Sequence, residues 1–466
     1  MKTRKSNHTP WGVRIGLCLL LCLSLSVDEV GALSTAEERV FGEEFLYSIR
    51  KQFEFVEDEF ANDYINELGQ HLLTSLDTKL FPYRFYIIRD NTLNAFAAPG
   101  GHIFFFSGLI EMMESVDQLA AVICHEIGHI SARHLAQRIE QNKKIAIGTM
   151  AGALAGALLG GEVGKAVMVG SGAAGIQAQL NYSRDDERQA DQLGSKYTYE
   201  TGFNPVGMIE TLKMLERGEW SGVDGIPPYL LTHPSGPERM ANLEVLLSGY
   251  PPKPDSPKTV KFRRRFPFFK TILRAKTMNP DDAERWFLDE VEKHPDSVLA
   301  QFGLGVLWKE KMEYAKALER LKRAMSIEPE SLPVLRHLGE TYQFLGRDRD
   351  SVAVLEKALG IEGRDRAALA LLAVSYQNLD EHDKAISLFE RLKLMSPVRD
   401  DVFYNLGVSY GRIGRLALAH YNFGIYFRRR GEPDKARFHF SKAEELGRND
   451  PALMDRVREA LKTVSP

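Results

Sequence analysis

Two histidines four residues apart, with a glutamate beside the first, carry the clearest chemical signal in this sequence. They are His125 and His129, and the glutamate is Glu126. The preceding residues, 116–124, have helical apolar spacing and contain no Gly or Pro. On a helix, residues four apart point to one side, so both imidazoles can bind one Zn²⁺ at about 2.0–2.1 Å. Glu126 can reach water at such a metal without binding the metal itself. The pattern predicts a catalytic zinc site on a helix.

A catalytic zinc site needs a third protein ligand and an open position for water. His134 is on another side of the helix if residues 132–133 continue it, and we interpret it as a packing or surface residue. Glu187 is a better candidate, because it shares one face of a second predicted helix with Asp191. Glu187 could bind the metal while Asp191 accepts a hydrogen bond from a ligating histidine. Solvated carboxylates on an exposed helix would give the same spacing.

Four separated motifs strengthen the first interpretation. They are the stretches 94–101 (NAFAAPGG), 125–134 (HEIGHISARH) and 187–191 (ERQAD), and Thr232-His233-Pro234 with Arg239. In this order they resemble the M48 family of zinc metallopeptidases, over about residues 36–247. The resemblance implies the following roles: one zinc ion per chain bound by His125, His129 and Glu187, Glu126 as the general base, and His233 over the metal.

The role of His233 has two interpretations. It follows a Gly- and Pro-rich stretch, 222–228, and precedes Pro234, so the segment could move as a lid. Ser235 and Glu238 have the spacing of a capping box that would define the next helix. His233 could close the metal site as a fourth ligand, or it could donate a hydrogen bond to the developing oxyanion. We favour the closing role, because of the resemblance and the lid-like segment.

Two β-rich runs, 82–88 and 102–107, precede the predicted metal helix. The run 103–106 could be an edge strand that pairs with an extended substrate, or a core strand with Phe on both faces. Residues 145–178 are rich in Gly and Ala, and their first apolar run is too short to span a bilayer. We expect a helical hairpin there that contacts a membrane surface.

The N-terminus is typical of a cleaved secretory signal. Basic residues precede an apolar run, 15–27, and a small residue, Ala32, stands at the expected cleavage point. We therefore expect a signal peptide over 1–32 and a periplasmic protein. Cleavage would leave Cys124 as a small buried hydrophobe that cannot form an internal disulfide. The net charge of −3 gives no reason to expect nucleic-acid binding.

A Pro-rich stretch, 251–257, indicates the end of the first domain. We expect a linker over 251–279, and we expect the residues after Pro257 to be removable without loss of the metal. The length of 466 residues also exceeds what one hydrophobic core usually holds.

The C-terminal part repeats with a period of 34 residues. Small residues recur at this interval at Gly305, Gly339, Ala373 and Gly407. Twelve residues after each of them stand Ala317, Ser351, Ala385 and Ala419. Gly424 and Ala436 keep the twelve-residue offset out of phase and suggest a further pair of helices. The pattern resembles tetratricopeptide repeats, which stack into a solenoid with a concave binding face. A structural spacer is the alternative.

We therefore expect an α+β, zincin-like metalloprotease domain over 33–250, mostly helical with a small sheet. An all-α tetratricopeptide-repeat solenoid should follow over 280–466. The resemblance implies a secreted zinc endopeptidase that cleaves misfolded or stalled envelope and outer-membrane proteins. Its repeats would recruit these clients or the outer-membrane assembly machinery. The alternative is a chaperone-like binding module with a latent protease.

Overall fold

The computed structural model describes residues 34–141, 182–217, 227–395 and 398–464. The expected signal peptide (1–32) and the expected hairpin (145–178) lie outside the described residues. Within the described residues, no helix combines the length and the apolar character that crossing a membrane requires.

A small mixed sheet forms the centre of the N-terminal domain. Its strands are β1 (Arg84–Ile88), β2 (Ala95–Ala98) and β3 (His102–Phe106), in the order β1-β3-β2. β3 pairs parallel with β1 and antiparallel with β2, and all its residues are buried. The apolar run at 103–106 is therefore the core strand, and the edge-strand interpretation of it was wrong. Gly100 and Gly101, with φ of 77° and 87°, make the left-handed turn between β2 and β3.

The two faces of the sheet pack against different helices, because successive side chains of a strand point to opposite faces. Phe104 and Phe106 pack with the aromatic face of helix α2 (Thr35–Gln52). Ile103 and Phe105 belong to the main core on the other face. The helices on that side are α3 (Glu59–Leu72) and α5 (Val116–Ser131).

The outer edge of β1 is closed by side chains of α3. The amide of Asn66 accepts a hydrogen bond from Phe85 N (3.3 Å) and donates one to Phe85 O (3.1 Å). Gln70 donates in the same way to Tyr83 O at 3.2 Å. These amides satisfy backbone groups that a neighbouring strand would otherwise bind. The other edge of the sheet, β2, lies beside α5.

The remaining helices of this domain frame the sheet and α5. They are α4 (Ser107–Met112), α6 (His134–Gln141), α10 (Arg184–Glu200), α11 (Gly207–Arg217), α12 (Pro228–Thr232) and α13 (Pro237–Leu247), with 3-10 turns at Leu73–Ser75 and Pro99–Gly101. Cys124 is fully buried in α5, and burial raises the pKa of its thiol to about 12.

Most of the expected linker is a helix. Residues 251–256 have no regular secondary structure, but α14 spans Pro257–Thr277, with Ser256 as its N-cap and Pro257 in its first turn. Its buried apolar residues join the main core of the N-terminal domain, and α14 also packs on the first repeat helix, α16 (Val298–Glu310). The expectation of a linker over 251–279 was wrong, because these apolar side chains need burial on two sides.

The C-terminal part is a stack of antiparallel helix pairs, so the expected fold class is confirmed. After α15 (Pro280–Lys293) and α16 come α17 (Tyr314–Ile327), α18 (Leu332–Phe344), α19 (Asp348–Ile361), α20 (Arg366–Asn378), α21 (His382–Lys393), α22 (Asp400–Arg412), α23 (Leu416–Arg429), α24 (Pro433–Leu446) and α25 (Pro451–Lys462). A Cβ on Gly305 would lie 2.7 Å from Leu321, and one on Gly339 would lie 2.7 Å from Leu355. The periodic glycines are therefore the contact points of paired helices.

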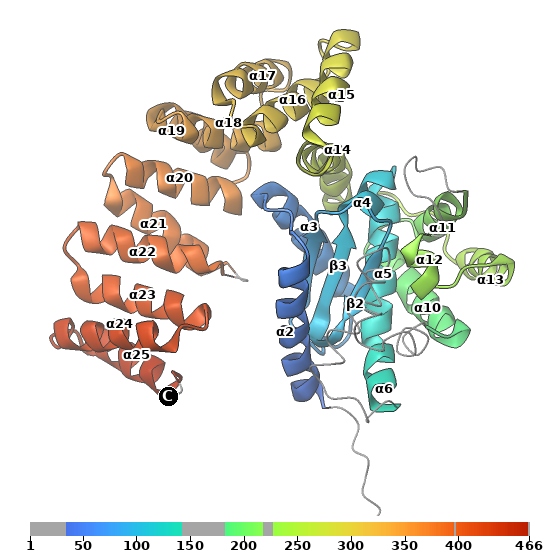
Figure 1. Ribbon diagram of the computed structural model, residues 1–466, viewed down its shortest axis with the longest axis horizontal. Helices are drawn as coiled ribbons and strands as arrows, with labels where there is room; N and C mark the ends of the chain where they lie inside the picture. Colours follow the sequence, from blue (N-terminus) through green and yellow to red (C-terminus); the bar gives the residue numbers. More distant parts are fainter. Residues whose placement is uncertain (1–33, 142–181, 218–226, 396–397, 465–466) are drawn as a thin grey trace, which may run out of the picture.

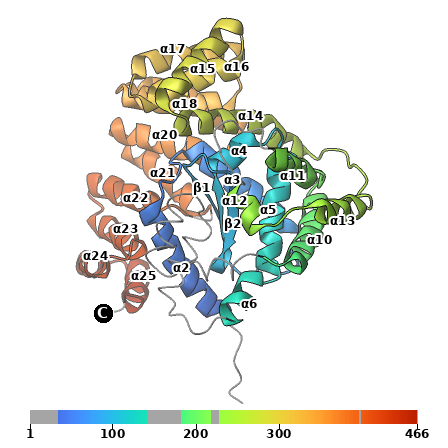
Figure 2. The same cartoon turned by 45° about the vertical axis from the view of Figure 1, so that its right-hand side comes forward.

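The solenoid leaves the N-terminal domain at α14 and curves back beside it (Figure 1). Figure 2 shows the same arrangement after rotation, with α22 to α25 on the side of α2. The inner side of the arc therefore faces α3, and α20 contacts this helix directly.

Candidate metal centre

Two helices that cross at glycines carry most of the predicted site. α5 starts at the N-cap Ser115, and α10 starts at Ser183, where a capping box with Asp186 fixes the first turn. A Cβ on Gly194 of α10 would lie 3.0 Å from the His125 backbone, and one on Gly128 of α5 would lie 2.9 Å from Ala190 O. The absence of side chains at both crossings lets the two helices approach closely.

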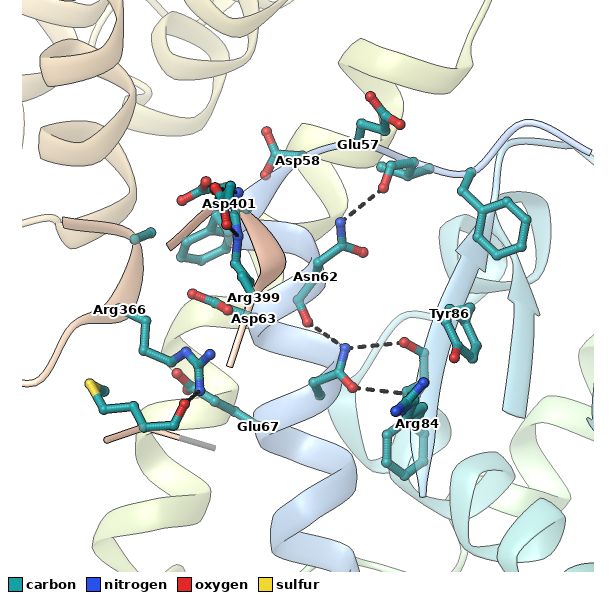
Figure 3. Close-up of a pocket in the computed structure, with 18 of the residues that line it drawn as sticks. Glu57, Asp58, Asn62, Asp63, Glu67, Arg84, Tyr86, Arg366, Arg399 and Asp401 are labelled. Carbon is teal, nitrogen blue, oxygen red and sulfur yellow. Dashed lines mark hydrogen bonds and ion pairs between the residues drawn. The ribbon is translucent and has the colours of Figure 1, made fainter. Parts of the chain in front are cut away.

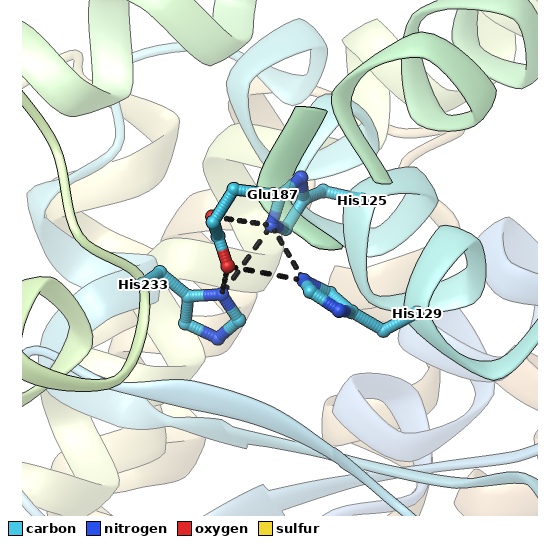
Figure 4. Close-up of side chains that lie close together, drawn as sticks. All are labelled: His125, His129, Glu187 and His233. Atoms are coloured by element: carbon cyan, nitrogen blue, oxygen red, sulfur yellow. Dashed lines mark hydrogen bonds and ion pairs between the residues drawn. The ribbon is translucent and has the colours of Figure 1, made fainter. Parts of the chain in front are cut away.

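Four buried side chains from three segments converge between these helices. His125 and His129 come from α5, Glu187 from α10, and His233 from the residue after α12 (Figure 4). One ligand atom of each lies within 4.8 Å of the others. The structure therefore brings together all three ligands expected from the sequence and adds His233 to them.

The spacing of the ligand atoms fits a tetrahedral metal. Around zinc with bonds of about 2.0–2.1 Å, tetrahedral ligand atoms are about 3.3 Å apart. Nε2 of His125 lies 3.0 Å from Nε2 of His129 and 3.4 Å from Nδ1 of His233. Oε1 of Glu187 lies 3.0 Å from His233 Nδ1 and 3.4 Å from His129 Nε2, and the other oxygen, Oε2, lies 3.5 Å from His125 Nε2. Two or three imidazoles and one carboxylate are also a donor set that zinc prefers.

Glu126 lies beside the cluster without belonging to it. Its carboxylate is fully buried and lies 3.5 Å from His233 Nε2 and close to the backbone N–H of Ala97 on β2. Neither oxygen has a hydrogen-bond partner of normal geometry among the described residues. Burial raises the pKa of this carboxyl, which makes it ready to hold a proton. The position matches the one expected for a general base.

Asp191 and Arg239 support the ligands from outside. An oxygen of Asp191 lies 3.0 Å from Nδ1 of His125, the ring nitrogen that points away from the cluster. Arg239 binds both oxygens of Asp191, at 2.8 and 2.9 Å, and lies 2.5 Å from Glu187. Burial raises the pKa values of Asp191 and Glu187, but Arg239 and nearby histidines outweigh this and lower both. Arg239 belonged to the fourth sequence motif without an assigned role, and the structure shows that it binds the carboxylates of Asp191 and Glu187.

The pKa values of the two histidines on α5 are shifted in opposite directions. Burial lowers the pKa of His125, but its bonds to Asp191 and Glu187 outweigh this and raise it to about 9. Burial lowers the pKa of His129 well below its usual value. The two histidines therefore have different electrostatic environments, although both face the same cluster.

His134 is a buried packing residue outside the ligand cluster, in line with the interpretation from the sequence, but the expected continuation of the helix through residues 132–133 was wrong. Helix α5 does not continue through residues 132–133 but ends at Ser131, and Arg133 adopts a left-handed φ of 56°. His134 is buried, at 2% exposure, and its Nδ1 lies 2.9 Å from Nδ1 of His129. It is not a member of the ligand cluster, yet it is in direct contact with one ligand. No sequence signal for this turn exists, because it contains no Gly or Asn.

The segment around His233 is fixed differently from the expectation. The next helix, α13, begins at Pro237 with Gly236 as a cap that makes no side-chain bond, so the expected capping box was wrong. The hydroxyl of Ser235 donates instead to Glu216 at 2.7 Å. The His233 ring stacks on Tyr229, with centroids 4.5 Å apart, and Arg239 donates to Pro234 O at 3.2 Å.

A second site of interest is a groove of about 1070 Å³ between α3 and the inner side of the repeats (Figure 3). Glu59 of α3 forms an ion pair with Arg399, which precedes α22. Asp63, one turn further along α3, lies close enough to Arg336 and Arg366 for their charges to lower its pKa. Burial and neighbouring carboxylates nevertheless raise the pKa of Glu59 to about 7 and that of Asp63 to about 6. Carboxylates of α3 thus face arginines of the repeats across the groove, and apolar residues line much of the space between them.

A small sheet, a helix with two clustered histidines and a carboxylate on a following helix are the features of a metallopeptidase domain, here joined to helical repeats. Residues 59–246 match the model of the family described as Peptidase family M48, and residues 368–401 match that of the Tetratricopeptide repeat. The chain thus contains a family M48 peptidase domain followed by tetratricopeptide repeats, as the sequence motifs implied.

Three relatives have similar names. The "Putative beta-barrel assembly-enhancing protease" of Vibrio cholerae is 30% identical over 64% of this chain and 62% of that protein. The "Beta-barrel assembly-enhancing protease" of Escherichia coli K12 is 32% identical over 45% of this chain and 44% of that protein. The protein of that name from Yersinia pestis is 26% identical over 78% of this chain and 75% of its own length. The chain thus spans less than two thirds of the first two relatives.

Proposed function

We propose that this protein is a zinc-dependent endopeptidase. The observation that carries the proposal is the tetrahedral spacing of ligand atoms from His125, His129, Glu187 and His233, with the Glu126 carboxylate beside them. Zinc held there would act as a Lewis acid that polarises a peptide carbonyl and makes water a better nucleophile at neutral pH. One such site is available per chain in the described residues.

Glu126 would move the proton. Its buried carboxylate has no hydrogen-bond partner of normal geometry among the described residues, so it is free to accept the proton of the attacking water. It would then donate that proton to the nitrogen of the leaving amine as the peptide C–N bond breaks. Asp191 and Arg239 would hold His125 and Glu187 in place throughout, through the bonds described above.

His233 would keep the resting site closed. Its Nδ1 lies in the ligand cluster, 3.0 Å from Glu187 and 3.4 Å from His125. A fourth protein ligand leaves no open position for water or substrate, so the ring would have to move before catalysis. This position supports the closing role over that of an oxyanion donor. While the site is closed, the protein would act as a binding module with a latent protease, which is the second candidate function. A client that opens the site would start catalysis.

Strand β2 is the best candidate to bind an extended substrate. It is an edge of the sheet, it lies beside α5, and the N–H of Ala97 lies close to Glu126. A peptide that pairs with β2 would bring its own backbone to the general base through sequence-tolerant hydrogen bonds. The opposite edge, β1, cannot serve in this way, because Asn66 already binds the backbone of Phe85 and Val56 N donates to Ile87 O.

The clients would be unfolded or misassembled envelope proteins in the periplasm, including outer-membrane proteins. The names of the relatives and the repeat domain support this. The groove between α3 and the repeats, with its two charged walls, would bind such clients or the assembly machinery. A peripheral membrane contact through residues 145–178 belongs to the same proposal.

The test compares wild type, Glu126→Gln and His233→Ala, each loaded with zinc, on unfolded casein. Wild type should cleave casein, and Glu126→Gln should lose activity while it keeps zinc. His233→Ala should cleave faster than wild type if the ring closes the site. A loss of about 10²–10³-fold in His233→Ala with zinc retained would instead assign the oxyanion role. Equal activity in wild type and Glu126→Gln would contradict the proposed chemistry.

A further inference from the structure

A left-handed residue folds the chain back onto the metal centre. Arg133, with φ of 56°, separates α5 from α6, and its guanidinium donates to Glu38 of α2 at 3.1 Å. The turn places His134, the first residue of α6, against the back of His129. Had α5 continued without interruption, residue 134 would lie on another side of the helix from residue 129. The turn is therefore what brings the two rings together.

The contact involves the ring nitrogen of His129 that faces away from the metal cluster. Nδ1 of His129 lies 2.9 Å from Nδ1 of His134, while Nε2 of His129 lies in the cluster, 3.4 Å from Glu187. The ring of Tyr182 stacks on His129 with a centroid distance of 3.8 Å and fixes its plane. With the plane fixed by stacking, the bond at Nδ1 sets how the ring is rotated within that plane.

The neighbours of His134 determine which way the hydrogen bonds run. Nε2 of His134 lies 2.9 Å from Oε1 of Gln189, and an oxygen of Asp186 lies 3.8 Å from the same nitrogen. The Gln189 oxygen accepts, so Nε2 of His134 carries a proton, which the nearby Asp186 carboxylate also favours; in the neutral ring Nδ1 then has the lone pair. Nδ1–H of His129 then donates to His134, and Nε2 of His129 keeps a lone pair for the metal.

We propose that His134 is a positioning residue that sets the tautomer and the rotation of the metal ligand His129, with Gln189 orienting His134 in turn. The inference rests on the proposed metal site. The site then has two orienting groups of different charge: the carboxylate of Asp191 behind His125 and a neutral imidazole behind His129. Outer partners of this kind typically change metal affinity by about 10–100-fold when they are removed.

The test measures the zinc dissociation constant of the full chain by competition with a chromogenic chelator. His134→Leu fills the same space without an acceptor, and we expect it to bind zinc about 10–100-fold more weakly. His134→Asn places an amide oxygen where Nδ1 lies, and it should restore affinity to within about threefold of wild type. The metal-free forms of both variants should melt at the same temperature, because packing is kept in both.

A second pair of variants keeps the inference testable if residue 134 does not tolerate change. Gln189 and Gln192 are both exposed on α10, so substitution there leaves the core intact. Gln189→Lys replaces the acceptor with a donor and reverses the preferred tautomer, so zinc binding should weaken. Gln192→Lys adds the same charge nearby and should bind zinc as wild type does.

Unchanged zinc affinity in His134→Leu, or equal losses in the Leu and Asn variants, would overturn the inference. Equal losses in the two lysine variants would also overturn the role of Gln189. Zinc affinity is measured without a substrate, so a protein that binds zinc but cleaves nothing contradicts the proposed function and leaves this inference standing. A wild-type chain that binds no zinc would overturn both.

Discussion

Replacement of Gly194 by alanine would place a methyl group between the two helices that carry the metal ligands. The added Cβ would lie 3.0 Å from Cα and from N of His125, where ordinary contact begins at 3.4 Å. Both atoms are backbone, so they cannot turn aside, and α10 must move away from α5 by about 0.4 Å. Metal sites tolerate deviations of only about 0.2 Å in ligand distances. Glu187 should therefore lose its place in the cluster.

The energetic cost follows from the same contact. Overpacking costs about 1–3 kcal/mol, and the change from Gly to Ala in a helix returns about 0.4–1 kcal/mol. We expect a net loss of about 1–2 kcal/mol in the free energy of unfolding, together with zinc binding at least about tenfold weaker. Urea unfolding of the metal-free protein and chelator competition measure the two effects separately.

A matched control is available in the repeats. Gly360 lies in α19, and a Cβ there would meet nothing within 4 Å. Gly360→Ala should therefore leave zinc affinity unchanged and stabilise the chain by about 0.4–1 kcal/mol. If Gly194→Ala matches the control in both measurements, the helix contact does not set the ligand geometry and the reasoning fails.

Three further outcomes are expected. Arg239→Met leaves the buried carboxylates of Glu187 and Asp191 without their cation, so the metal-free protein should lose about 3–5 kcal/mol of stability, and a loss below about 1 kcal/mol in urea unfolding would contradict this. In the folded protein the pKa values of Glu59 (about 7) and Asp63 (about 6) lie above their ordinary values. The folded state is therefore stabilised while both side chains are protonated, and this stability is lost as pH rises from about 4 to 7. The double variant Glu59→Gln, Asp63→Asn should therefore match wild type at pH 4 and exceed its melting temperature at pH 8; a lower value at pH 8 would refute the sign. Addition of zinc at about 100 times its dissociation constant should stabilise the chain by about 2.7 kcal/mol in calorimetry, and an unchanged melting temperature would show that the folded state does not bind zinc selectively.

The sequence predicted the features that depend on local spacing. His125 and His129 on α5, and Glu187 and Asp191 on α10, share faces because residues four apart on a helix always do. The periodic glycines of the repeats predicted helix contacts for a related reason: paired helices approach closely only where side chains are small. In these cases the local pattern and the final packing agree.

The missed features depend on the tertiary structure. A left-handed arginine at position 133 is uncommon, and only its contact with Glu38 and the burial of His134 show why the chain turns there. The Pro- and Arg-rich start of α14 masked an apolar helix whose burial comes from both domains. The sequence did suggest His233 as a fourth ligand, but the place of its ring among the other three residues depends on α12, which is far from α5 in the sequence.

Helix α14 determines how the molecule should come apart when it unfolds. One hydrophobic core runs without interruption from Val56 to Tyr342, whereas the later repeats have two cores of their own. Denaturant should therefore melt the last repeats first, while the peptidase domain and the earliest repeats unfold as one cooperative unit. A truncation after Pro257, which the sequence had suggested, would strip the apolar side chains of α14 from this unit. A peptidase fragment that folds alone must end beyond the second repeat helix pair, not before the first.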